Sequence, residues 1–190
     1  QDEVTIAEML KTKGYTTGAI GKWHMGEHYD YRPMRHGFDH YFGKLHNFNR
    51  FKKGSGIYEQ DNLTKDSVHY ENMHELVTNK AKEFINKANE KETPFFMYLS
   101  HYLVHGPWKP NKRFTTNKEW NTRLEKQGDI NPIVYPAMVR ELDWHIGEIV
   151  KELEKLGMTE NTVIFFTSDN GPWLTNNHNY DINRLAQYRL

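Results

Sequence analysis

Three short apolar runs alternate with three helix-like segments along this chain, and this alternation constrains its fold class. The runs cover residues 15–21 (YTTGAIG), 94–100 (PFFMYLS) and 162–171 (TVIFFTSDNG). Apolar residues at helical spacing precede them or lie between them, over about 5–14, 71–89 and 136–156. The last two runs are nearly unbroken, which is typical of strands buried on both faces. We therefore expect a layered α/β domain with a mostly parallel sheet.

Local signals mark where the first and third helices begin and end. Thr5 and Glu8 have the spacing of a capping box, in which each side chain satisfies the other residue's backbone amide. Gly14 and Gly157 follow the last apolar residue of their segments, where a left-handed glycine ends a helix. Residues 22–70 carry little periodicity and are predicted to be irregular surface structure.

Charge and cysteine content exclude several classes of function. The chain has 25 basic and 25 acidic residues, so it lacks the positive charge expected of a nucleic-acid-binding protein. No apolar run is long enough to span a bilayer. Cysteine is absent, which excludes a disulfide, a thiolate nucleophile and a cysteine-bound metal within this chain.

A polar cluster follows each predicted strand. Lys22, Trp23 and His24 follow the first strand, Ser100, His101 and His105 follow the second, and Ser168, Asp169, Asn170 and Gly171 end the third. In a parallel sheet the carboxyl ends of the strands meet at one edge, where ligands bind. The sequence therefore predicts that these three clusters converge.

The residue types in the clusters are typical of a metal-assisted site for an anionic ester. Asp169 and Asn170 offer oxygen ligands of the kind that calcium and magnesium take, although SDNG is also a favoured turn and two oxygens are too few. Lys22 and His24 suit an oxyanion, with flanking glycines that would let the backbone approach a ligand. The alternative is a solvated lysine beside a packed histidine.

Two histidines compete for the role of a proton donor to the leaving oxygen. His105 lies in the loop before Gly106-Pro107, and His101, nearer the strand, has an equal claim from spacing alone. His145 is predicted to be a helix-packing residue. The remaining histidines are predicted to be mostly surface or capping residues: 28, 36, 40, 46, 69, 74 and 178.

Four ordered blocks of the sequence resemble the sulfatases of the alkaline-phosphatase superfamily. They are TIAEMLKTKGYTTGAIGKWHMG, PMRHGFDHYFG, PFFMYLSHYLVHGPW and AMVRELDWHIGEIVKELEKLGMTENTVIFFTSDNGP. The resemblance covers nearly the whole chain and is weakest between about residues 44 and 70. It implies a three-layer α/β/α sandwich, with residues 1–190 forming part of a single catalytic domain that is incomplete at both ends.

The resemblance also implies an activity and a role for each site residue. Lys22 and His24 would hold the sulfate, and His105 would contact the sulfate or assist the leaving oxygen. Asp169 and Asn170 would help to bind a divalent metal, Ca²⁺ or alternatively Mg²⁺. The reaction would be hydrolysis of an aryl or carbohydrate sulfate monoester by a formylglycine nucleophile. The partner would be a sulfated small molecule or glycan, in a secreted, lysosomal or periplasmic setting.

Three features of that family are absent from this sequence. It has no C/S-x-P/A-x-R motif to become formylglycine, no N-terminal acidic pair of metal ligands, and no lysine between residues 171 and 190. We expect an internal fragment that is inactive by itself. Two alternatives stay open: a metal-dependent phosphodiesterase or phosphatase of the same superfamily, and a non-catalytic anion- or glycan-binding protein. The sequence sets neither the substrate nor the oligomeric state.

Overall fold

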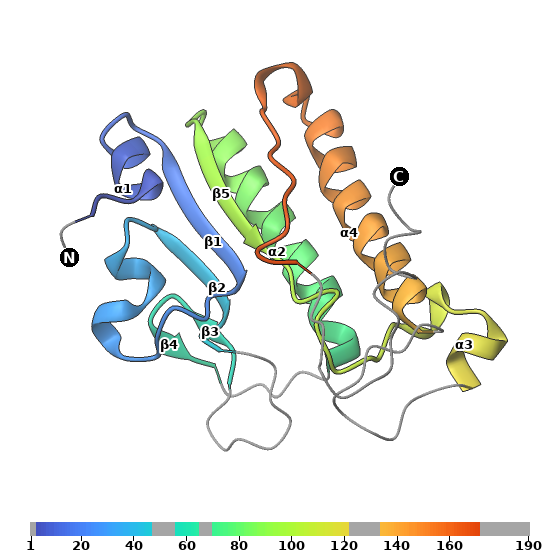
Figure 1. The fold of residues 1–190 in the computed structure, drawn as a ribbon. Helices are drawn as coiled ribbons and strands as arrows, with labels where there is room; N and C mark the ends of the chain where they lie inside the picture. The colour runs from blue at the N-terminus through green and yellow to red at the C-terminus, as the bar shows by residue number, and fades with distance from the viewer. Residues whose placement is uncertain (1–2, 47–55, 65–69, 122–133, 172–190) are drawn as a thin grey trace.

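A twisted sheet forms the centre of the molecule (Figure 1). The computed structural model describes residues 3–46, 56–64, 70–121 and 134–171. Within these residues the sheet has five strands in the order β4-β3-β2-β1-β5. The strands are β1 (Thr16–Lys22), β2 (His40–Lys44), β3 (Tyr58–Glu59), β4 (Asn62–Leu63) and β5 (Phe95–Ser100). β1 runs parallel to both β2 and β5, whereas β3 and β4 are short antiparallel additions.

Helices cover both faces of this sheet. α1 (Ile6–Lys11) packs on one face, and α2 (Tyr70–Glu90) lies along the other (Figure 1). α4 (Tyr135–Lys155) packs along α2. The short elements are η1 (Tyr29–Tyr31), η2 (Pro33–Arg35), η3 (Lys112–Phe114), α3 (Asn117–Asn121) and η4 (Thr159–Asn161). The predicted layered α/β architecture with a mostly parallel sheet is confirmed.

Two separate cores form because side chains alternate along the strands. Ile20 and Phe42 point toward α2 and join its apolar stripe, which includes Val77 and Ile85. Ala19 and its neighbours on β2 point the other way and pack with Ala7 of α1. The sequence therefore assigns each strand residue to one of the two layers.

The local helix signals are confirmed. Thr5 and Glu8 form both hydrogen bonds of the capping box, at 3.1 and 2.8 Å. Gly157 has φ +67° directly after α4, which matches the predicted left-handed stop. The predicted strands at 15–21 and 94–100 correspond to β1 and β5, and the predicted helices at 71–89 and 136–156 correspond to α2 and α4.

The predicted burial of β5 on both faces is wrong. Phe95, Met97 and Leu99 pack against the α2 core, but Tyr98 on the opposite face is 41% exposed. α1 has six residues and packs over β1, so it leaves this part of β5 uncovered.

The region predicted to be irregular, residues 22–70, contains the central strand β2 and the small strands β3 and β4. β2 was missed because its five residues give too short a run for period-two alternation to stand out. Residues 47–55 and 65–69 of that region lie outside the described part of the chain.

The prediction of a buried strand at 162–171 is also wrong. Residues 162–168 have no regular secondary structure and run beside the sheet without joining it (Figure 1). Val163, Phe165 and Phe166 are 72–89% exposed. An apolar run reports a preference for burial, whereas a strand also needs a partner for its backbone hydrogen bonds. Among the described residues, no strand pairs with residues 162–168.

Gly21 allows β1 and β5 to approach closely. Its φ is +113°, and a Cβ built on it would lie 1.9 Å from the backbone oxygen of Ser100. Real side-chain carbons cannot occupy that position, so β1 requires glycine there.

We predict that Gly21→Ala destabilises the full-length protein by about 3 kcal/mol, because strain at positive φ adds to a backbone clash. Gly157→Ala is the matched control, since Gly157 also has positive φ but no atom within 4 Å of its Cβ position. It should cost about 1 kcal/mol. Chemical denaturation measures both, and equal losses would contradict the close-approach explanation.

Candidate functional site

The Lys22-Trp23-His24 turn is held in place by its own backbone. The Trp23 amide donates to the Lys44 carbonyl at 3.0 Å, and the His24 amide donates to the Leu45 carbonyl at 2.9 Å. Backbone hydrogen bonds between the two segments therefore continue two residues beyond the end of β1, although the strand pairing itself ends at Lys22 and Lys44. The Trp23 indole is buried and donates to the Tyr31 carbonyl at 2.6 Å.

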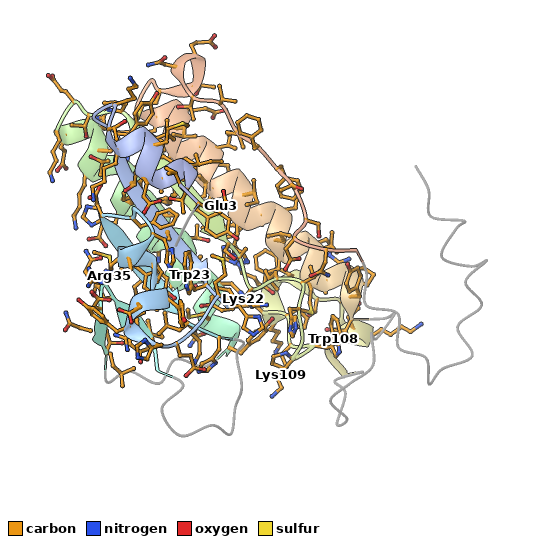
Figure 2. All side chains as sticks on the ribbon, turned by 60° about the vertical axis from the view of Figure 1, so that its left-hand side comes forward. Glu3, Lys22, Trp23, Arg35, Trp108 and Lys109 are labelled. Atoms are coloured by element: carbon orange, nitrogen blue, oxygen red, sulfur yellow. The ribbon has the colours of Figure 1, made fainter. Side chains whose placement is uncertain are left out.

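Trp23 and Lys22 lie on opposite sides of the sheet. Trp23 packs in the α1 core, so its strand neighbour Lys22 lies toward the α2 side of the sheet at its carboxyl edge, and His24 follows just beyond the strand end. In Figure 2, Lys22 lies between Trp23 and the segment that carries Trp108 and Lys109. His24 has φ +59°, an uncommon conformation that the flanking pairing imposes.

The flanking glycines are required by the fold. A Cβ on Gly21 would collide with Ser100, and a Cβ on Gly26 would lie 2.7 Å from Cβ of Tyr31. Both glycines are therefore required by neighbouring parts of this chain. Clearance for a bound group at these glycines stays a prediction.

Four of the five predicted site residues are electrostatic neighbours. Burial lowers the pKa of Lys22, and the charge of Asp169 opposes this shift. Burial also lowers the pKa of His24, with further lowering by Lys22, His46 and His105. Three segments that are distant in sequence thus meet at one edge, while the role of each residue stays a prediction.

His105 and His101, the two candidates for the proton donor, have different surroundings in the structure. The His105 ring is exposed at the edge, and its Nδ1 lies 2.7 Å from the Gly106 carbonyl. Because a carbonyl only accepts, Nδ1 carries the proton and Nε2 is left to meet a ligand. The backbone of His105 is fixed by Tyr70, whose hydroxyl donates to its carbonyl at 2.6 Å. His101 instead points into the interior.

A buried histidine cluster lies beneath the His105 loop. The ring of His74 on α2 lies 5.3 Å from the ring of His101 and 6.3 Å from that of His145 on α4. His145 is 2% exposed, so its predicted packing role is confirmed, whereas the prediction that most remaining histidines are surface residues fails for His74, which is 0% exposed. In the described structure, neither ring nitrogen of His74 has a hydrogen-bond partner.

Asp169 and Asn170 lie in an exposed turn that bonds to itself. The Ser168 hydroxyl donates to the Asn170 carbonyl, and the Asn170 amide donates to the Gly171 carbonyl, both at 2.7 Å. One carboxylate and one amide oxygen are a donor set that suits calcium, which takes six to eight oxygen ligands. No group of three or more metal-ligating side chains occurs among the described residues, so the metal site stays a prediction.

Sequence reasoning missed two residues of this edge, Lys44 and His46. Lys44 is the register partner of Lys22 and is 4% exposed. His46 contributes to the lowered pKa of His24, and its Nε2 lies 3.8 Å from Oε1 of Glu27. A signal existed, because residues 43–46 read GKLH and residues 21–24 read GKWH.

Comparison with known proteins identifies the family. A model described as Sulfatase matches residues 1–189. The chain belongs to the sulfatase family. The resemblance carried by the four sequence blocks is therefore confirmed, and this family gives the converging edge a chemical context.

Named relatives and solved structures agree with this assignment. N-acetylgalactosamine-6-sulfatase of Mus musculus is 32% identical, over 89% of this chain and 33% of that protein. A solved chain from work on the metabolism of multiple glycosaminoglycans by Bacteroides thetaiotaomicron is 26% identical with a TM-score of 0.71, covering 90% of this chain and 46% of that one. Ps i-CgsB, solved in complex with k-i-k-neocarrahexaose, is 25% identical with a TM-score of 0.63, covering 80% and 36%.

The chain spans about a third of the length of the mouse relative. Among the helices described, none combines the length and apolar character that crossing a membrane requires.

We predict that the buried histidines make stability fall in acid. Burial lowers the pKa of His101 to about 3 and that of His74 well below 6.5. Below pH 6.5 the unfolded chain therefore binds protons that the folded chain does not, and stability is lost as the pH falls toward these depressed values.

Between pH 7.5 and 5, the free energy of unfolding of the full-length protein should fall by about 2 kcal/mol less in His74→Leu than in wild type. Denaturant unfolding at the two pH values measures this difference. His28→Leu is the control, because the His28 side chain is 70% exposed, and it should keep the wild-type pH dependence. A wild-type pH dependence in His74→Leu would contradict the prediction.

Proposed function

We propose that the protein containing this chain is a sulfuric ester hydrolase that removes sulfate from a carbohydrate sulfate monoester. The observation that carries this proposal is the meeting of Lys22, His24, His105 and Asp169 at one edge of the sheet, in a chain of the sulfatase family. A sulfate monoester is an anion, so a partly desolvated site with positive groups suits it.

Lys22 and His24 would hold the sulfate oxygens. Their positions are fixed by the backbone pairing with β2 and by the buried Trp23 ring, so little reorganisation is needed when the anion arrives. The lowered pKa of His24 favours a neutral ring near pH 7, which can donate one hydrogen bond without adding to the charge of Lys22.

His105 would serve the leaving oxygen. When the ester bond breaks, negative charge develops on the alcohol oxygen, and the doubly protonated His105 ring can donate to it from Nε2 while its Nδ1–H keeps the contact with the Gly106 carbonyl. The Tyr70 hydroxyl holds the backbone of His105, and the Nδ1 contact with Gly106 sets the ring orientation. This geometry supports His105 over His101, whose ring is buried among other histidines.

A divalent cation and a nucleophile complete the proposed site. Asp169 and Asn170 would hold the cation, Ca²⁺ or Mg²⁺, which supplies charge stabilisation to the sulfate oxygens when bound. The proximity of Asp169 to Lys22 supports this placement. The nucleophile, a formylglycine by family resemblance, would come from a part of the protein outside this chain.

Glycans are the substrate class that we propose. Support comes from a relative named N-acetylgalactosamine-6-sulfatase and from a structural neighbour solved with a neocarrahexaose. We further propose that residues 1–190 form part of one catalytic domain. The secreted, lysosomal or periplasmic location stays a prediction.

We predict that Lys22→Ala in the full-length protein lowers kcat/KM for N-acetylgalactosamine 6-sulfate about 10²- to 10³-fold, because a preorganised charge contact is lost. Sulfate release measures turnover, and thermal unfolding should be unchanged. The matched control is Lys13→Ala, which removes an exposed lysine just beyond α1 and should leave turnover at the wild-type level.

Wild-type turnover by Lys22→Ala would contradict the role of Lys22 in holding the sulfate. Faster hydrolysis of a phosphate ester than of any sulfate ester by the wild-type protein would favour the phosphatase alternative. Binding of the sulfated sugar without any turnover would favour the non-catalytic alternative.

A further inference from the structure

The His105 loop, residues 101–111, connects β5 to η3 and contains no helix or strand. Within it the His105 amide donates to the Tyr102 carbonyl at 3.1 Å, which closes a turn. A loop without ladder hydrogen bonds takes its position from the elements packed around it. The place of the His105 ring at the edge therefore depends on contacts between this loop and the rest of the chain.

The middle of the loop is held by Tyr70 of α2. The buried Tyr70 hydroxyl donates to the His105 carbonyl at 2.6 Å, and the Tyr70 ring lies perpendicular to the His74 ring, with centroids 4.6 Å apart. Burial raises the pKa of Tyr70, and the charge of Glu141 raises it further, so the hydroxyl keeps its proton and remains a donor. This charge effect also makes Tyr70 and Glu141 neighbours, although they belong to different helices.

The end of the loop is held by Glu141 of α4. Glu141 is 1% exposed, and its Oε2 accepts a hydrogen bond from the Asn111 amide at 2.8 Å. A carboxyl group at a buried position costs free energy unless its oxygens meet hydrogen-bond donors. The proposed mechanism gives this buried acid no part, and its contact with Asn111 joins it to the loop that carries His105.

His145 lies beside the other carboxylate oxygen of Glu141. It is one turn further along α4, and its Nε2 is 3.8 Å from Oε1 of Glu141. Nδ1 of His145 is 2.8 Å from the Thr78 hydroxyl oxygen, and that hydroxyl already donates to the His74 carbonyl at 3.0 Å. Thr78 can then only accept, so Nδ1 of His145 carries a proton. The ring beside Glu141 is thus oriented by a side chain of α2.

A third contact comes from the sheet. The Lys44 amide, at the end of β2, donates to the buried Tyr102 hydroxyl at 2.7 Å. The loop is therefore held at Tyr102 by β2, at His105 by α2 and at Asn111 by α4. Contacts from three elements fix where the His105 ring lies relative to Lys22.

We propose that Glu141 and Tyr70 are positioning residues for the reaction, which hold the His105 loop so that Nε2 of His105 reaches the leaving oxygen. The inference rests on the proposed function for the role of His105. A general acid acts only within hydrogen-bond reach of the oxygen that it protonates, so a small displacement of the loop lowers the rate. The effect of Glu141 and Tyr70 on the reaction passes through His105.

The test compares two leaving groups in the full-length protein. The alcohol of N-acetylgalactosamine 6-sulfate needs a proton to leave, whereas the phenolate of 4-nitrophenyl sulfate leaves readily without one. Tyr70→Phe keeps the ring and removes the hydroxyl, and Glu141→Met removes the acceptor at a similar side-chain length. Each should lower kcat about tenfold for the sugar sulfate and less than about twofold for the aryl sulfate, with both KM values within about twofold of wild type.

Two further variants are controls. Glu141→Gln keeps an oxygen that can accept from the Asn111 amide, so its kcat for the sugar sulfate should stay within about threefold of wild type. Tyr15→Phe removes a hydroxyl just before β1, at the opposite end of that strand from Lys22, and should match wild type on both esters. Equal kcat losses on the two esters, or wild-type kcat in both Tyr70→Phe and Glu141→Met, would overturn the proposal.

Hydrogen exchange measured by mass spectrometry keeps this test separate from the proposed activity. In Tyr70→Phe and Glu141→Met the amides of residues 101–111 should exchange faster than in wild type, while those of β1 keep the wild-type rate, which excludes global unfolding. Wild-type exchange of the loop in both variants would refute the positioning role. Faster loop exchange in a protein that releases no sulfate from any ester would support the loop contacts and refute the hydrolase proposal.

Discussion

The in-register contact between β1 and β2 at two glycines is the constraint on which the candidate site depends. A Cβ on Gly43 would lie 1.7 Å from the Gly21 carbonyl oxygen, and a Cβ on Gly21 would meet Ser100 of β5. Three parallel strands can approach each other at this level only because two of them carry glycine. This contact fixes where the next residues of both strands lie, among them Lys22, His24, Lys44 and His46.

The edge combines a rigid backbone with side chains that repel one another. Buried Trp23 and Tyr102 anchor the strand ends from different elements, and both make hydrogen bonds to backbone groups. Asp169 lies near Lys22, and Oε1 of Glu27 lies 3.8 Å from Nε2 of His46. Burial lowers the pKa of Lys22 and of His24 at this edge, and partly desolvated cationic groups of this kind suit an anion, which links the geometry of the fold to the proposed chemistry.

Signals that act within a few residues could be predicted from the sequence. Examples are the capping box at Thr5, the stop at Gly157 and the strands that precede Lys22 and His101. The meeting of Lys22, His105 and Asp169 at one edge also followed from the expected parallel sheet. Other long-range features could not be predicted. The burial of His74 depends on α4 packing along α2, and the exposure of residues 163–166 depends on the absence of a pairing partner. The neighbourhood of His46 required knowledge that β2, a strand too short to detect, lies beside β1.

Anion binding at the edge can be observed directly in crystals of the full-length protein soaked with selenate, a close analogue of sulfate that anomalous diffraction can locate. The structure predicts a selenium peak at the carboxyl edge of the sheet, with its oxygens about 3 Å from Nζ of Lys22 and a ring nitrogen of His24. Selenate bound elsewhere on the protein, with no peak beside these two residues, would contradict the assignment of this edge as the sulfate site.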